Sequence, residues 1–303
     1  MRGIILAVGV LVSCVLAEVV YAQGTWPDIL IPYVDPTFIT IDGLGTDWED
    51  PAVYPQKYRL SSADDPDYFS FRAGDLPSGP EDFSAVLYLG WSTDNMLYVY
   101  SQVTDDVLKG TGIRNGSSWG QETIQIMTDA DNIGGPYREG GLEAEHAQQF
   151  GVRLRQGVPM GPGGNEDDTV CHILAEDGAK WITGPDFFYA VVDYPANTTA
   201  VTYAYEFKLA LWDEVGLSVD ESQRHDAFAS FLADTPIGLA IVWNDCDMVP
   251  GNMDSKIGTM SPDGYDFWNN ADAFNDAYLV GSPYALIDAV APSSWGAVKA
   301  SLR

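Results

Sequence analysis

Three features of the sequence predict an all-β protein, an antiparallel β-sandwich with long loops rich in glycine, proline and aspartate. Residues 201–209 alternate between large apolar side chains and mostly polar ones, with the period of two that a half-buried strand requires. Residues 83–92 and 96–104 form a hairpin, because two apolar runs flank the turn-forming segment Thr93-Asp94-Asn95. No stretch alternates strands with helices as a parallel sheet requires, so the short strands are expected to pair in antiparallel order.

The two clearest strand patterns differ in their expected burial. Residues 96–104 are apolar on both faces, with Leu97 on one and Tyr98 on the other, so this strand is expected between two layers. Residues 201–209 carry Glu206 and other polar side chains on one face only. One face of this strand is therefore expected in the core and the other in water.

The remaining elements are expected between loops, in chain order. Residues 23–38 are an extended lead-in, residues 39–50 hold a short strand, a glycine turn and a tryptophan flanked by acids, and residues 51–82 are mostly loop. Further strands are expected at residues 123–128, 148–155, 237–243 and 277–280, and short helical turns at residues 211–217 and 221–232.

The chain is strongly acidic, which limits its partners. Its 303 residues include 44 aspartates and glutamates against 15 lysines and arginines, a formal net charge of −29. Binding to nucleic acid or to an anionic membrane requires a basic patch, so neither partner is expected. The carboxylates either keep the protein soluble or, in some loops, hold a hard cation such as calcium. Hydrophobic residues make up 46% of the chain, enough for a sizeable core.

The first 22 residues are predicted to be a secretory signal peptide. They contain one arginine, a long apolar run and the end Val20-Tyr21-Ala22, which predicts cleavage before Gln23. The segment Leu11-Val12-Ser13-Cys14 also resembles a bacterial lipobox, so a lipoprotein anchored through Cys14 is an alternative. No later stretch approaches the roughly 20 apolar residues of a membrane helix. The protein is therefore expected to be secreted, periplasmic or attached to the cell surface.

The exported chain is expected to consist of a β-sandwich domain at residues 23–281 and a C-terminal tail at residues 282–303. The tail either packs back on the domain or serves in export or attachment. Apart from Cys14 the chain has Cys171 and Cys246, which pair in an oxidising compartment only if the fold brings them together.

One stretch has the features of a sugar-binding loop. Trp119 stands in a turn rich in glycine and serine, directly before residues 123–128, whose side chains alternate between two faces. A flat indole at the lip of a strand, close to hydrogen-bonding side chains, can stack on the apolar face of a sugar ring. Most of the nine tryptophans are expected in the core, among them Trp91, Trp181, Trp212 and Trp243. Trp119 and Trp268 are the candidates for ligand contact.

Oxygen-rich loops follow two of the expected strands. Asp129 and Asp131 come after the first of these strands, and Asp245 and Asp247 come after the second. The first loop is not an EF-hand, because isoleucine and glycine occupy its fifth and twelfth positions. The alternatives are solvated loop carboxylates or a generic calcium site with ligands among Asp129, Asp131, Asp245 and Asp247, with Asp42 and Asp47 as further candidates.

No catalytic arrangement is predicted. Residues 116–120 match G-x-S-x-G, but a nucleophile elbow lies between a strand and a helix, whereas an alternating strand follows this segment. His146, His172 and His225 lack the spacing of a metal-binding motif. No carboxylate pair suited to glycoside hydrolysis can be singled out among 44 acidic residues.

Several motifs follow one another over about residues 34–280. They are Ile41-Asp42-Gly43 with Trp48, Leu97-Tyr98-Val99 with Val103 and Asp105, Trp119 with the strand to Asp129, Glu206, Ile237-Gly238 through Asn244-Asp245, and Trp268 before Asn275. In this order they make the chain resemble the family 9 carbohydrate-binding modules. The resemblance implies a jelly-roll-like β-sandwich, non-catalytic sugar binding and structural calcium, often in an appendage of enzymes that degrade plant polysaccharides.

The resemblance also implies a binding site. In that family two tryptophans hold a terminal sugar between them, and the matching positions are Trp119 and Trp268. A family glutamate falls on Gln125, and a family arginine falls on Gly151, with Arg153 two residues further on. The implied site therefore consists of Trp119, Trp268, Gln125 and Arg153.

Two alternatives stay open at this point. Gln125 and Gly151 replace charged partners of the sugar hydroxyls, which is compatible with a structural cell-surface domain whose site has decayed. A related sandwich binds haem b for electron transfer, and Met127 and His146 are the candidate ligands for that function.

Overall fold

The computed structural model describes residues 28–49, 58–60, 77–108, 122–137, 146–153, 170–174, 186–191, 198–216, 218–247, 255–259 and 267–281. The expected signal peptide, Trp119 and the tail at residues 282–303 lie outside these residues.

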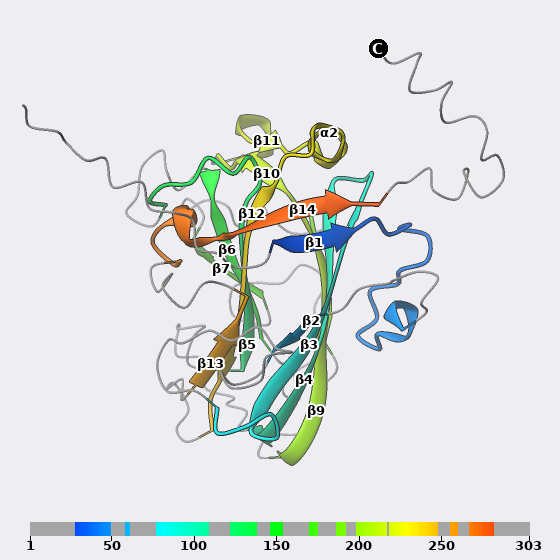
Figure 1. The fold of residues 1–303 in the computed structure, drawn as a ribbon, viewed down its shortest axis with the longest axis vertical. Coiled ribbons are helices and arrows are strands. Elements are labelled where there is room, and N and C mark those ends of the chain that lie inside the picture. Colours follow the sequence, from blue (N-terminus) through cyan, green and yellow to red (C-terminus); the bar gives the residue numbers. More distant parts are fainter. Residues whose placement is uncertain are drawn as a thin grey trace, which may run out of the picture.

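Two β-sheets form the body of the protein (Figure 1). The larger sheet has seven strands, in the order β1 (Ile29–Pro32), β14 (Asn275–Val280), β12 (Ile237–Asp245), β5 (Thr123–Asp129), β6 (Gln148–Arg153) and β7 (Val170–Leu174), with β13 (Ser255–Gly258) also paired to β12. The smaller sheet has five, in the order β2 (Tyr58–Leu60), β3 (Phe83–Ser92), β4 (Met96–Leu108), β9 (Thr198–Ala210) and β8 (Phe187–Val191).

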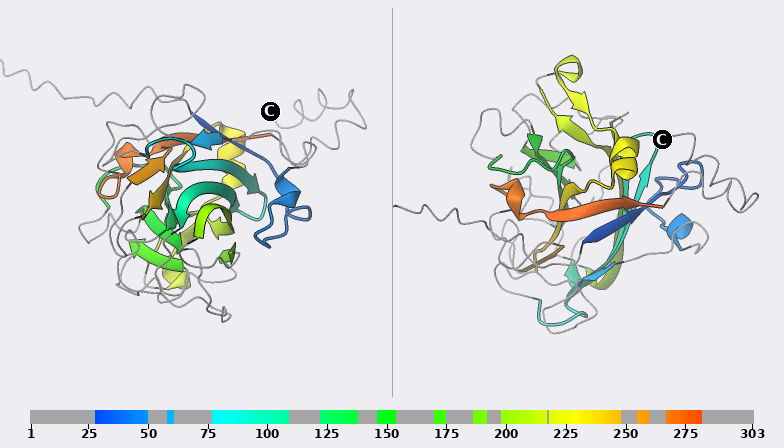
Figure 2. Two further views of the ribbon diagram at one scale, coloured as in Figure 1. Left: turned by 90° about the horizontal axis from the view of Figure 1, so that it is seen from below. Right: turned by 45° about the horizontal axis from the view of Figure 1, so that its top comes forward.

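The pairs within these sheets are antiparallel, apart from β1, which runs parallel to β14. A separate hairpin of β10 (Trp212–Glu214) and β11 (Gln223–Arg224) lies near α2 (Ala227–Ala233) at one end of the molecule (Figures 1 and 2). The predicted fold class, an antiparallel β-sandwich, is confirmed.

The hairpin predicted at residues 83–104 is confirmed in detail. Ser92 pairs with Met96, so the turn is the expected three-residue segment. Asn95 in this turn has φ 59°, a left-handed conformation that asparagine tolerates better than most residues. The first six residues of β4 are all buried, as expected for a strand that is apolar on both faces.

The core between the sheets is rich in aromatic side chains. Trp91, Trp212 and Trp243 are almost completely buried in it, which confirms the prediction for these three residues. Trp243 Nε1 of β12 donates a 2.9 Å hydrogen bond to Ser101 Oγ of β4, so the two sheets are joined by a satisfied polar contact. Full burial of a large apolar side chain stabilises the fold by about 1.5–3 kcal/mol, which makes this cluster the main source of stability.

The prediction that one face of residues 201–209 is wet is wrong at Glu206. This side chain has no exposed surface, although it faces away from the core. Its carboxylate accepts hydrogen bonds from the backbone N–H groups of Asp42 (2.9 Å) and Gly43 (2.6 Å) and from Trp48 Nε1 (2.7 Å). The segment around the 3-10 helix η1 (Thr46–Trp48) therefore folds over the outer face of the five-stranded sheet.

Several short elements differ from the expectations. The described part of the segment at residues 39–50, which ends at residue 49, contains helix η1 and no strand. Of residues 211–217, the described residues 211–216 hold strand β10 and no helical turn. Helix α2 begins inside the expected helical segment at residues 221–232 and ends one residue after it. Strands β1, β2, β7, β8 and β13 were not expected. They are short, and their pairing depends on neighbours that are distant in sequence.

The outer face of the seven-stranded sheet carries a second apolar cluster. It consists of Met127, Tyr137, Ala147, Ala240, Val242, Phe267, Ala271 and Phe274. Residues 130–137 and 267–274 meet over this face, where Tyr137 Oη donates a 2.7 Å hydrogen bond to the carbonyl oxygen of Phe267. Half-buried Trp268 packs against the same cluster. In the part of the chain that the structure describes, no helix is long and apolar enough to cross a membrane.

Candidate functional site

The alternation of side chains along β5 defines the outer face of the seven-stranded sheet. Ile124 and Ile126 are buried in the core between the sheets. Because successive side chains of a strand point to opposite faces, Thr123, Gln125 and Met127 lie on the outer face. Met127 accordingly belongs to the outer apolar cluster.

Four positions form one register row across this face, which we call the outer row. Lys256 of β13 pairs with Asn244 of β12, Asn244 pairs with Thr123 of β5, and Thr123 pairs with Arg153 of β6. Neighbouring strands lie about 4.8 Å apart, so the outer row extends over roughly 14 Å. Lys256 and Asn244 are 5% and 2% exposed. The fold thus places two cationic residues and two uncharged polar residues side by side.

The next row on the same face contains Gln125. It pairs with Val242 on one side and with Gly151 on the other. Gln125 Oε1 accepts a 2.6 Å hydrogen bond from Nε2 of Gln149, so two largely buried amides are linked at this point of the face. Glycine at position 151 adds no side chain beside them.

Trp268 stands next to the outer row. Its ring makes an edge-on contact with Phe267, with ring centroids 4.5 Å apart. The ammonium Nζ of Lys256 lies 4.4 Å from the centroid of the Trp268 ring, a distance typical of a cation–π contact. Burial lowers the pKa of Lys256 to about 8.

The structure brings three of the four residues of the implied sugar site onto this face: Trp268, Gln125 and the backbone position of Arg153. The fourth, Trp119, lies outside the described residues. Glu122, three residues further on, is described and comes immediately before β5. Lys256 and Gln149 were not predicted as site residues, because only the strand register brings them next to Gln125 and Asn244.

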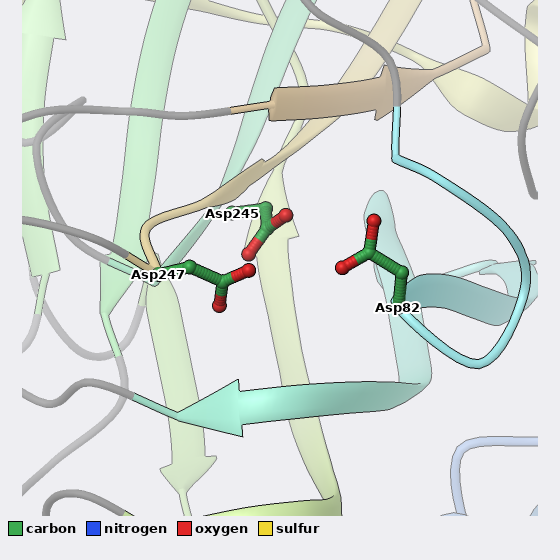
Figure 3. Close-up of side chains that lie close together, drawn as sticks. All are labelled: Asp82, Asp245 and Asp247. Atoms are coloured by element: carbon green, nitrogen blue, oxygen red, sulfur yellow. The ribbon is translucent and has the colours of Figure 1, made fainter.

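A separate cluster of carboxylates gathers at one end of the two sheets. Its members come from the start of β3, the end of β4, the start of β5 and the end of β12: Asp82, Asp105, Asp106, Glu122, Asp245 and Asp247. Three sets of three residues have carboxylate oxygens within 4.8 Å of one another: Asp82, Asp245 and Asp247; Asp105, Glu122 and Asp245; and Asp105, Asp106 and Asp247. Figure 3 shows the carboxylate of Asp82 turned toward those of Asp245 and Asp247.

Burial changes the ionisation of this acidic cluster. It raises the pKa of Asp245 to about 8 and that of Asp105 to about 6, with neighbouring carboxylates adding to both rises. Burial, followed by the charges of Asp105 and Asp245, also raises the pKa of Glu122 well above its ordinary value. Ser255 Oγ donates a 2.7 Å hydrogen bond to Asp245 Oδ2, whereas the buried Asp245 Oδ1 has no hydrogen-bond partner among the described residues. The acidic cluster could hold a metal ion.

The four aspartates expected to form a calcium site do not gather in one place. Asp245 and Asp247 belong to the acidic cluster, whereas Asp129 is at the far end of β5, opposite Gly238. Asp129 Oδ2 accepts a 2.8 Å hydrogen bond from the Gly134 backbone, and burial, with Asp131 as the next cause, raises the pKa of Asp129 to about 7.

Sequence reasoning did not assign Asp82, Asp106 and Glu122 to a site, and it used Asp105 only as a landmark of the resemblance. The predicted hairpin could have identified part of this acidic cluster. Because Phe83 pairs with Asp105, the residues Asp82 and Asp106 come together at the open end of the hairpin, where the Asp106 N–H donates a 2.9 Å hydrogen bond to the Asp82 carbonyl. The contribution of β12 to the same end could not be inferred, since it requires the packing of the two sheets.

Two other arrangements bear on function. Met127, a candidate haem ligand, is fully buried in the outer apolar cluster, so ligation would require the covering segments to open. His225 lies between Asp213 (2.5 Å from Nδ1) and Ser230 (2.9 Å from Nε2), in the order of a serine-hydrolase triad. Ser230 is inside α2 and not on a strand-to-helix elbow, and the contacts link this helix to the β10–β11 hairpin.

Comparisons with known proteins agree with this architecture. No family model and no curated protein sequence matches the chain. Among solved structures, a family 9 carbohydrate-binding module from Caldicellulosiruptor kristjanssonii in complex with cellotriose is similar over 86% of this chain and 97% of its own, with 18% sequence identity and a TM-score of 0.52. A structure of a family 9 module from the same organism in complex with glucose is similar over 84% of this chain and 97% of its own, with 17% identity and a TM-score of 0.51. The chain therefore has the fold of the family 9 carbohydrate-binding modules.

Proposed function

We propose that this protein is an exported, non-catalytic carbohydrate-binding module that holds its sugar on the outer face of the seven-stranded sheet. The observation that carries the proposal is that Trp268 and the linked amides of Gln125 and Gln149 lie on the same face of the seven-stranded sheet. An indole stacks on the apolar C–H face of a sugar, and amide groups bond its hydroxyls.

Two further considerations support this function. The similar solved structures contain cellotriose and glucose, and this chain covers 97% of each of them. Trp119 occurs four residues before the start of β5 in the sequence, and β5 bears Gln125. In this proposal Trp119 and Trp268 stack on the two faces of the sugar ring.

Binding of the mature protein to a glycan array, followed by calorimetry with the best ligand, tests the proposal. Trp119→Ala and Trp268→Ala should each weaken binding by at least about tenfold, the equivalent of 1.4 kcal/mol. The matched control is Phe38→Ala, because Phe38 is 57% exposed and lies in the segment that leads to η1, away from this face. Undiminished binding by both tryptophan variants, each with a native circular dichroism spectrum, would refute the proposed surface.

The acidic cluster is proposed to hold calcium. The candidate ligands are carboxylate oxygens, which suit a hard cation such as Ca²⁺. The bound ion would offset the mutual repulsion of Asp105, Glu122 and Asp245 and join the ends of the two sheets. Calorimetric titration of the chelated protein with calcium should show binding that Asp245→Asn weakens and that Asp220→Asn, on exposed η4 (Val219–Glu221), leaves unchanged. Equal affinity in the two variants would place the ion elsewhere.

Export is part of the same proposal. It rests on the pattern of residues 1–22, and the N-terminal sequence of the secreted protein should begin at Gln23. A product that begins with lipidated Cys14 would support the lipoprotein alternative.

A further inference from the structure

We propose that the saccharide bound by the outer face carries an anionic group, a carboxylate or a sulfate ester, which contacts Lys256 and Asn244. This inference rests on the proposed function, because it names the class of sugar that the proposed surface takes.

The first argument is the concentration of cationic residues in the outer row. The whole chain has 15 lysines and arginines among 303 residues, yet two of the four positions of the outer row are cationic. Lys256 and Arg153 occupy the ends of the row, with Asn244 and Thr123 between them. A ligand at the β13 end of the row would meet the positive charge of Lys256.

The second argument is the lack of described carboxylates next to the row on this face. The following row consists of Gly258, Val242, Gln125, Gly151 and Cys171, and the row after it includes Ala240, Met127 and Gln149. None of these residues is acidic, in a chain whose formal net charge is −29. Asp245 and Glu122, in the acidic cluster, follow Asn244 and precede Thr123, so they point to the other side of the sheet.

The third argument is an unsatisfied donor inside the row. Asn244 is 2% exposed, and its Nδ2 is buried without a hydrogen-bond partner among the described residues. A buried N–H group without an acceptor costs free energy, which an acceptor oxygen of the ligand would recover. Asn244 is the register neighbour of Lys256, so one carboxylate or sulfate can accept from both side chains.

The environment of Lys256 fits this role. Its Nζ lies 4.4 Å from the centroid of the Trp268 ring, so the ammonium group is held beside the indole proposed to carry the sugar. Burial disfavours the charged form of this lysine and lowers its pKa to about 8. An anionic ligand would favour the charged form again.

The experiment compares acidic oligosaccharides with matched neutral ones. The mature protein is titrated with uronate-containing oligosaccharides and their carboxyl-reduced counterparts, and with sulfated oligosaccharides and their desulfated counterparts. Lys256→Gln is the test variant. Lys208→Gln is the matched control, because it removes the same charge from a lysine beside an aromatic ring of the other sheet, where Lys208 Nζ lies 5.1 Å from the centroid of the Tyr98 ring.

We expect at least one anionic glycan to bind ten or more times tighter than its neutral counterpart, with a preference that declines as salt is added. Lys256→Gln should lose most of this preference and keep the native circular dichroism spectrum, whereas Lys208→Gln should retain the preference. A preference within the uronate and carboxyl-reduced pair would identify a carboxylate as the recognised group, and a preference within the sulfated and desulfated pair would identify a sulfate.

Equal binding of anionic and neutral glycans, unaffected by Lys256→Gln, would overturn the inference and leave the proposed function intact. Failure of the unmodified protein to bind any glycan would overturn both. Because Lys256 is buried, Lys256→Arg provides a second variant. This variant keeps the charge and should preserve the preference for anionic glycans. Loss of the preference in a folded Lys256→Arg protein would show that the positive charge is not the recognised feature.

Discussion

Removal of the cation proposed for the acidic cluster should make the stability of the protein strongly dependent on pH. Asp245 has a pKa of about 8 in the folded state, against an ordinary value of 3.8. A carboxyl group whose pKa is raised by folding binds more protons in the folded state than in the unfolded state. Its contribution to the free energy of unfolding is therefore present at low pH and is lost as the pH rises from about 4 to about 8. Each unit of pKa difference corresponds to about 1.4 kcal/mol, so the loss from Asp245 alone is on the order of 5 kcal/mol.

The assay is urea unfolding followed by tryptophan fluorescence at about pH 5 and pH 8, with excess chelator or with millimolar calcium. About 4 kcal/mol of this loss falls between pH 5 and pH 8, three pH units at about 1.4 kcal/mol each. It is a large part of the stability of many domains and should lower the urea midpoint of the chelated protein by roughly 1.5–2 M. Calcium should reverse most of this loss at pH 8, since the bound ion compensates the ionised carboxylates. Asp245→Asn should reduce both effects, and Asp220→Asn should change neither. A chelated protein that is as stable at pH 8 as at pH 5 would refute the reasoning.

Three further predictions concern the fold and the outer face. Glu206→Ala leaves three N–H donors without their acceptor, so it should lower the free energy of unfolding by about 3–6 kcal/mol in urea titrations. Glu206→Gln should lower it less. A loss below about 1 kcal/mol in Glu206→Ala would contradict the role of this carboxylate. Gly45→Ala should lower the melting temperature more than Gly135→Ala. Both glycines have positive φ, but a Cβ added at position 45 would lie 2.0 Å from Cζ of Tyr100, whereas a Cβ added at position 135 would have no atom within 4 Å. Equal melting temperatures of the two variants would argue against this packing. Burial lowers the pKa of Lys256 to about 8, so between about pH 8 and 10.5 this side chain binds fewer protons in the folded state than in the unfolded state. The free energy of unfolding should therefore rise across that range relative to that of Lys256→Gln. Parallel plots of unfolding free energy against pH for the two proteins would exclude this buried charge.

The fold class could be predicted because its signals are local. The hairpin at residues 83–104 shows its strands through apolar runs and its turn through Thr93-Asp94-Asn95, all within about twenty residues of sequence. Strands β5, β9 and β12 are also apolar enough to be recognised without knowledge of their neighbours. Short strands such as β13 carry no such signal, because their pairing with a distant strand supplies the stabilisation.

The burial of Glu206 shows the limit of a local pattern. Alternation correctly separates its face from the core face of β9 but cannot show that a segment 158 to 164 residues away covers that outer face. The same limit applies to Lys256, whose place beside Asn244 depends on the register of β12 and β13.

The sequence by itself determined the all-β class, the main hairpin, the core tryptophans and the acidic character of the chain, since each follows from composition or from alternation along one strand. Only the tertiary structure decided which carboxylates meet: it places Asp245 with Asp82, Asp105 and Glu122 and leaves Asp129 at the opposite end of β5. It also decided that Gln125 and Trp268 share one face of the sheet. The physical reason is that strand register and sheet packing bring together residues far apart in sequence, and the free energy that selects this arrangement comes from the shared core and not from the residues of the site.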